Sequence, residues 1–115
     1  MNIINSSGNL GAKDIYSLCM NPKTKKMKDV VDSRIPILNW AIFEDVAKKT
    51  GEIQEILAIQ TPDGEVYATN SATFKEDFLN MLELFTSMGE TVPAIAVTCG
   101  TSKAGREFIT CVYSD

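Results

Sequence analysis

The stretch that decides the fold is IPILNWAIFEDV, residues 35–46. It is apolar over most of its length and longer than the usual strand of about five or six residues. Trp40 and Phe43 would point to opposite faces of an extended strand, because side chains alternate along it. A long strand that is apolar on both faces, or bent so that each half joins a different sheet, is typical of the first strand of a small β-barrel. The sequence therefore predicts a small barrel built around residues 35–46.

Two hairpins are expected directly after this stretch. The polar, glycine-containing segment AKKTGE leads into a second apolar strand at residues 53–59. The segment TPDG, residues 61–64, then places Pro at the second turn position and Asp-Gly after it, which favours a tight reversal. The next strand is expected in EVYATN, so the first three strands form a meander.

The hydrophobic period then changes from two to 3.6, which predicts a helix over residues 73–88. The apolar stripe consists of Phe74, Phe78, Met81, Leu82, Phe85 and Met88. Thr73 with Glu76 has the spacing of a capping box, and Ser71 is the competing N-cap residue. Gly89 is a suitable residue to end the helix.

Two further strands, residues 92–99 and 107–113, flank the turn segment GTSKAGR. A helix between the third and fourth of five strands is the order of elements in an OB-fold. We therefore expect a mainly β protein, α+β by content, with a five-stranded OB-fold barrel. A plain α+β sandwich is the alternative.

The N-terminal part is expected to contribute little to this barrel. Residues 1–12 are rich in Asn, Ser and Gly and are predicted to be a flexible arm, able to mediate self-association. Residues 13–20, KDIYSLCM, alternate in a way that predicts an extra strand, and residues 27–32 predict a short return strand. Residues 13–115 are thus expected to form a single OB-fold domain.

Composition argues against catalysis and against a metal or other cofactor. The chain has no histidine and three cysteines, too few partners for a zinc site or a Cys/His nucleophile pair. We expect the cysteines to be reduced core residues. The segment Gly100 to Gly105 lacks the spacing of a phosphate loop and precedes a strand instead of a helix. No catalytic, metal-binding or cofactor-binding residue is therefore predicted.

The chain is also expected to act away from membranes, in the cytoplasm. No stretch approaches the roughly 20 apolar residues of a membrane span. The N-terminus lacks a charged start followed by an apolar run. The net charge of −4 argues against coating duplex DNA through bulk positive charge, but it leaves room for a local basic groove.

Basic residues cluster where an OB-fold binds its ligand. In that fold, the loop joining the first two strands and the loop joining the last two form the rims of one groove. The first loop would carry Lys48 and Lys49. The second would carry Thr101, Ser102, Lys103 and Arg106. Lys25, Lys26 and Lys28, which precede the first strand of the barrel, are further candidates for binding. Basic rims of this kind neutralise the phosphates of single-stranded DNA, while aromatic rings stack on its bases.

The aromatic residues divide into surface and core candidates. Tyr67 and Phe43 are predicted to be exposed, Phe43 because it shares a strand face with polar neighbours. Trp40 and Phe108 are predicted to be core residues, because their neighbours on the same face are apolar.

The order of these motifs resembles a known family. GEIQEILAIQTPDGEVYATNSATFKEDFLNML followed by GTSKAGREFI is similar to the single-stranded DNA-binding proteins of small tailed phages that replicate by protein priming, which have relatives on mobile elements of Gram-positive bacteria. The resemblance implies an OB-fold that coats single-stranded DNA without sequence preference during replication or conjugal transfer in the host cytoplasm. It implies contacts from Lys48, Lys49, Tyr67, Lys103 and Arg106.

Two other classes fit the same composition. A small phage or plasmid protein that inhibits or adapts a host protein would also be acidic, compact and without catalytic residues. A structural subunit would self-associate through an exposed strand edge or apolar patch. Both should ignore oligonucleotides, whereas the placement of the basic loops favours a DNA-binding protein.

Overall fold

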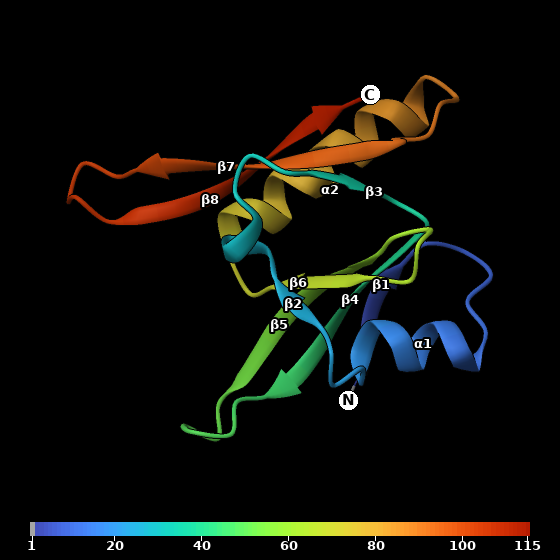
Figure 1. Cartoon of the computed structure of the whole chain (residues 1–115), viewed down its shortest axis with the longest axis horizontal. Coiled ribbons are helices and arrows are strands. Elements are labelled where there is room, and N and C mark those ends of the chain that lie inside the picture. Colours follow the sequence, from blue (N-terminus) through green and yellow to red (C-terminus); the bar gives the residue numbers. More distant parts are fainter. Residues whose placement is uncertain (1) are drawn as a thin grey trace. The chain divides into compact units, whose positions relative to one another are not determined.

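The computed structural model describes residues 2–115 and shows a mainly β protein, as the sequence predicts (Figure 1). Its strands form a five-stranded and a three-stranded sheet, neither of which closes on itself. The chain groups into two compact units, Met1–Lys26 with Leu38–Asn70 and Met27–Ile37 with Ser71–Asp115. Each unit therefore combines two separate parts of the sequence.

The first unit contains the five-stranded sheet. Its elements are β1 (Asn2–Ser6), α1 (Ala12–Cys19), β2 (Lys25–Lys26), β4 (Asn39–Val46), β5 (Ile53–Gln60) and β6 (Val66–Thr69). The strands lie in the order β1-β4-β5-β6-β2, and β4 and β5 form a regular antiparallel hairpin. The expected tight turn joins β5 to β6, with Gly64 at a φ of 91°. The predicted meander of three strands is thus confirmed.

Helix α1 covers one face of this sheet. Leu18 is 2% exposed and belongs to a buried cluster with Phe43 of β4 and Val66 of β6. Ala41 and Ala58, opposite one another on β4 and β5, complete the cluster. These small side chains leave the space that the helix occupies.

The prediction of a strand over residues 13–20 is wrong, because this segment is α1. Ile15, Leu18 and Cys19 have the i, i+3, i+4 spacing of one helical face, and Leu18 is the most deeply buried of them. The Asp14 side chain accepts a hydrogen bond from the Gly11 backbone N–H at 3.1 Å, which stabilises the first turn. In eight residues, a period of two and a period of 3.6 fit almost equally well.

The N-terminal segment, expected to be a flexible arm, contains strand β1. Its residues pair antiparallel with β4, from Asn2 opposite Glu44 to Ser6 opposite Ala41. The Ser7 hydroxyl then accepts a hydrogen bond from the Trp40 backbone N–H at 3.0 Å. The free edge of β4 thus supplies the hydrogen bonds that this polar segment lacks by itself.

The second unit contains the three-stranded sheet and the longer helix. Its elements are the 3-10 helix η1 (Met27–Val30), β3 (Arg34–Pro36), α2 (Ala72–Ser87), β7 (Ala94–Thr101) and β8 (Glu107–Ser114). The strands lie in the order β3-β7-β8, and both pairs are antiparallel. Phe85 of α2 stacks on Tyr113 of β8, with 5.1 Å between ring centroids. The return strand expected at residues 27–32 is wrong, because this segment forms η1.

Helix α2 confirms the predicted helix over residues 73–88. Ser71, the competing candidate, is the N-cap residue, and its hydroxyl accepts a hydrogen bond from the Phe74 backbone N–H at 3.2 Å. Gly89 follows the helix with a φ of 73°, which favours glycine. Phe74 and Phe78 are fully buried, whereas Met88 at the other end of the stripe is exposed.

The stretch of residues 35–46 contributes to both sheets. Its first part lies in β3, which pairs with β7, and its second part is β4, which pairs with β5. Ala41, Ile42 and Phe43 are consecutive and all buried, so both faces of β4 are covered there. This confirms a long stretch that is apolar on both faces and changes sheets along its length. Within residues 2–115, no helix is long and apolar enough to cross a bilayer.

Candidate nucleic-acid interface

The turn between β7 and β8 is a basic hairpin tip that hydrogen bonds close. The Ser102 backbone N–H donates to the Arg106 carbonyl at 2.8 Å, and the Ser102 hydroxyl accepts from the Arg106 N–H at 3.2 Å. Gly105 has a φ of 81°, as the turn requires. Lys103 and Arg106 are exposed, Ser102 is half-buried, and Thr101, expected in the loop, is the exposed last residue of β7. In the described part of the chain, Lys103 and Arg106 form no ion pair, so both charges face solvent.

Phe108 lies immediately beyond this tip and is 36% exposed. It pairs across the hairpin with Gly100, and a Cβ at Gly100 would come within 2.7 Å of the Phe108 Cζ. The ring therefore lies against the glycine. The prediction that Phe108 is a core residue is wrong, because Val112 on the same face is itself 40% exposed. The glycine in GTSKAGR was the feature that could have revealed this arrangement.

The turn between β4 and β5 carries Lys48 and Lys49, both exposed as predicted. A hydrogen bond from the Ala47 N–H to the Glu52 carbonyl at 2.8 Å closes the turn. Neither lysine forms an ion pair among residues 2–115. The strands behind the tip are acidic, however, with Glu44 directly opposite Glu55.

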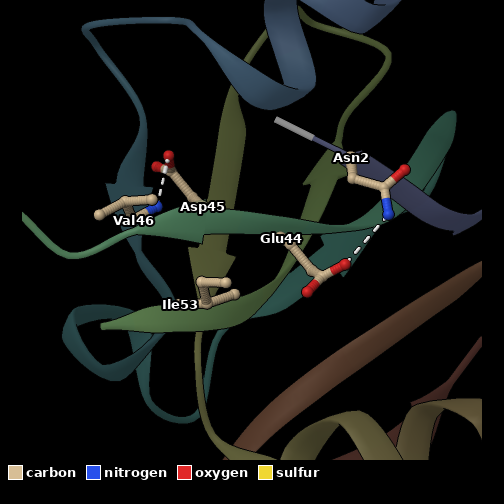
Figure 2. Close-up of a pocket in the computed structure, with 5 residues that line it drawn as sticks. All are labelled: Asn2, Glu44, Asp45, Val46 and Ile53. Carbon is tan, nitrogen blue, oxygen red and sulfur yellow. Dashed lines mark hydrogen bonds between the residues drawn. The ribbon is translucent and has the colours of Figure 1, made fainter. Parts of the chain in front are cut away.

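A small cavity of about 230 Å³ lies behind this tip and is lined by Asn2, Glu44, Asp45, Val46 and Ile53 (Figure 2). The Asn2 side-chain amide of β1 donates to a Glu44 carboxylate oxygen of β4 at 3.0 Å. The Asp45 carboxylate accepts from the Val46 backbone N–H. Two carboxylates at its wall make this cavity unsuited to a phosphate.

Lys25 and Tyr67 come together in the first unit. They lie opposite each other in the parallel pairing of β2 with β6, and the Lys25 Nζ lies 5.9 Å from the centre of the Tyr67 ring. The Lys25 Nζ also lies 2.9 Å from the Glu65 carboxylate, which raises the pKa of Lys25 through hydrogen bonding and charge. Glu65 thus competes with a phosphate for Lys25. Lys26 is the next residue of β2, whereas Lys28 lies in η1, in the other unit; both are exposed.

Phe43 is 3% exposed, so the prediction that it is a surface residue is wrong. Its polar neighbours suggested an outward face, but α1 covers that face and Leu18 belongs to the same buried cluster as Phe43. Trp40, predicted to be a core residue, is half-buried.

The three cysteines are free and differ in environment. Burial raises the pKa of the Cys111 thiol to about 12, with a further contribution from the Asp77 carboxylate. Burial and the nearby Asp45 raise the pKa of Cys19. Cys99 is exposed, so the core prediction is wrong for this residue. Residues 2–115 contain no group of three or more Cys, Asp or Glu side chains arranged to hold a metal ion.

The predicted site residues thus form two sets. Lys25, Lys26, Lys48, Lys49 and Tyr67 belong to the first unit, and Lys28, Thr101, Ser102, Lys103 and Arg106 to the second. In comparisons with known proteins, no protein-family model, curated protein or solved structure matches the chain.

Proposed function

We propose that this protein binds single-stranded DNA without sequence preference and coats it during phage or plasmid replication or transfer in the cytoplasm of a bacterial host. The protein acts stoichiometrically and uses no cofactor. Each of the two hairpin tips, one with Lys48 and Lys49 and the other with Lys103 and Arg106, offers exposed cations to the phosphates of the strand.

The observation that carries this proposal is the composition of the β7–β8 hairpin. Two exposed cations without an ion pair within residues 2–115, Lys103 and Arg106, stand beside an exposed aromatic ring, Phe108. Single strands are held by cations that neutralise phosphates and by rings that stack on bases. Hydrogen bonds hold the backbone of the turn, so that binding has to order only the side chains that it carries.

The route of the chain supports an OB-fold as the scaffold. One long stretch pairs with β7 through β3 and with β5 through β4, and α2 lies between β6 and β7 in the sequence. These are features of the OB-fold, whose first strand pairs with two others and whose helix separates the third strand from the fourth.

Binding should depend little on base sequence. The cations at both tips are lysines and one arginine at exposed turns, positions that suit contacts to phosphates. Reading of sequence requires side chains that reach base edges in a fixed geometry. We therefore expect similar affinity for different homopolymers, and a strong preference for one of them would contradict this part of the proposal.

The test is a titration of a labelled single strand long enough to span several sites, followed by fluorescence anisotropy at two salt concentrations. A duplex of matching sequence is the control. We expect the protein to bind the single strand with an affinity that falls steeply as salt increases, and to bind the duplex poorly. Absence of binding to the single strand at low salt would overturn the proposal.

A further inference from the structure

The three-stranded sheet of the second unit has one face that α2 does not cover. Tyr113 of β8 points to the face on which it stacks with Phe85 of α2. Because side chains alternate along a strand, Val112 and Phe108 point to the other face. The same register places on that face Arg34 and Pro36 of β3, Ala94, Ala96, Thr98 and Gly100 of β7, and Phe108, Thr110, Val112 and Ser114 of β8. We call the part of it from Arg34 and Ala96 to Gly100 and Phe108 the Phe108 face.

The Phe108 face contains no acidic side chain among these described residues, although the chain has 15 acidic residues and a net charge of −4. The strand residue Glu107 points to the opposite face by the same alternation. Arg34 is exposed, and its Nε donates to the backbone oxygen of Asp115 at 3.0 Å, which leaves the two terminal nitrogens of the guanidinium for other partners. Arg34 thus places a guanidinium at the β3 end of the face, beside Asp115, and at its other end the face continues into the tip with Lys103 and Arg106.

The side chains that β7 contributes to the Phe108 face are small, and the Phe108 ring covers Gly100. Ala96, Thr98 and Gly100 are small, and on β8 the larger Phe108 and Val112 stand beside them. The hydroxyls of Thr98 and Thr110 hydrogen-bond to each other across the strands. The row from Ala96 to Gly100 extends about 13 Å at roughly 3.3 Å per residue. The Phe108 face thus carries an aromatic ring at one end and a guanidinium at the other.

We infer that the Phe108 face binds the bases of single-stranded DNA, with Phe108 as the stacking residue and Arg34 as a phosphate contact beyond the hairpin tip. This inference rests on the proposed function and extends its site from the loop to the sheet. A sheet face that carries an exposed ring and an arginine and that continues into a basic tip matches the phosphates of a nucleic acid and the flat faces of its bases. The site includes Phe108 and Arg34, neither of which was among the residues predicted from the sequence.

The first test replaces the ring and leaves the charges. Phe108→Leu should weaken binding of an oligothymidine between about 5-fold and 150-fold, the factor that corresponds to the loss of one base–aromatic stack, without changing the salt dependence. Phe108→Trp should retain most of the affinity because it keeps a ring. Tyr16→Leu, which removes an exposed aromatic residue from α1, is the matched control and should bind like the parent protein.

The second test changes the charge. Arg34→Gln should reduce the steepness of log K against log salt by about 0.7, the value for one phosphate contact to a single strand. Lys13→Gln makes the same change in net charge on the exposed surface of α1 and should leave the slope as it is.

The third test needs no variant. An oligonucleotide that contains iododeoxyuridine should cross-link on irradiation to Phe108, in the tryptic peptide 107–115 that begins after Arg106. If the parent protein binds the single strand but Phe108→Leu binds equally well and no cross-link falls in this peptide, the inference is overturned while the proposed function stands. If the parent protein binds no single strand, both are overturned.

Discussion

The ring of Phe108 lies against Gly100 across the β7–β8 hairpin, so close that a Cβ at Gly100 would come within 2.7 Å of Cζ and 2.9 Å of Cε2. Glycine weakens the interior of a strand, and an aromatic ring laid over it shields the exposed backbone. The two residues therefore depend on each other.

This dependence can be measured with a double-mutant cycle. Gly100→Ala should destabilise the parent protein by about 1 kcal/mol, because the ring must move off the strand. In a Phe108→Ala background, the same substitution should be neutral or stabilising by about 0.5–1 kcal/mol, because alanine costs less backbone entropy than glycine. The stabilities are measured by urea denaturation. Gly8→Ala is the control, because no atom lies within 4 Å of a Cβ added at Gly8. Equal effects of Gly100→Ala in both backgrounds would contradict the contact.

Phe43 should matter for stability and not for direct contact with DNA. It is 3% exposed in the buried cluster with Leu18, so Phe43→Ala should lower the free energy of unfolding by about 3–5 kcal/mol. At a temperature at which this variant is still folded by circular dichroism, its affinity for a single strand should match that of the parent protein. A folded Phe43→Ala variant of normal stability that binds poorly would reverse this assignment.

Glu65 should restrain Lys25. Its carboxylate lies 2.9 Å from the Lys25 ammonium, which it would have to release for Lys25 to reach a phosphate. Glu65→Gln should therefore strengthen binding to single-stranded DNA. It should also steepen the plot of log K against log salt by as much as about 0.7, the value for one phosphate contact. Glu83→Gln removes the same charge from an exposed position of α2 and is the control. If both variants change binding equally, Lys25 does not contact the strand.

Cys111 should make stability fall at alkaline pH. Burial raises its pKa to about 12 from an ordinary value of 9.0, so above pH 9 the unfolded chain loses this proton while the folded protein keeps it. Ionisation then favours the unfolded state, and the contribution is lost progressively as pH rises from 9 toward 12. In urea denaturation between pH 7 and pH 10.5, the free energy of unfolding should decline more steeply with pH for the parent protein than for Cys111→Ala. Parallel curves would contradict the raised pKa.

The elements that the sequence predicted well are those with local causes. Helix α2 begins and ends where Ser71 caps it and Gly89 stops it, and the β5–β6 turn depends on four adjacent residues. Strand β1 was not predicted, because its short sequence of Asn, Ile and Ser becomes a strand through its pairing with the edge of β4. Helix α1 was missed because eight residues do not distinguish the two periods.

The difference between local and non-local causes also explains which residues of the candidate site were predicted correctly. The exposure of Lys103 and Arg106 follows from the turn composition of their own segment. The exposure of Phe43 and Phe108 was predicted the wrong way round, because it depends on which sheet face a helix covers. Helix α1 buries Phe43, and α2 packs on the face of β8 opposite to Phe108.

The central claim is that the exposed hairpin cations hold the phosphates of a single strand. The most direct test compares the salt dependence of oligothymidine binding for Lys103→Gln/Arg106→Gln with that of Lys13→Gln/Lys23→Gln, which removes the same charge from exposed positions elsewhere. We expect the hairpin variant to bind more weakly. The steepness of its plot of log K against log salt should decrease by about 1.4, twice the value of about 0.7 for one phosphate contact, while the control keeps the steepness of the parent protein. Identical slopes for all three proteins would contradict the account.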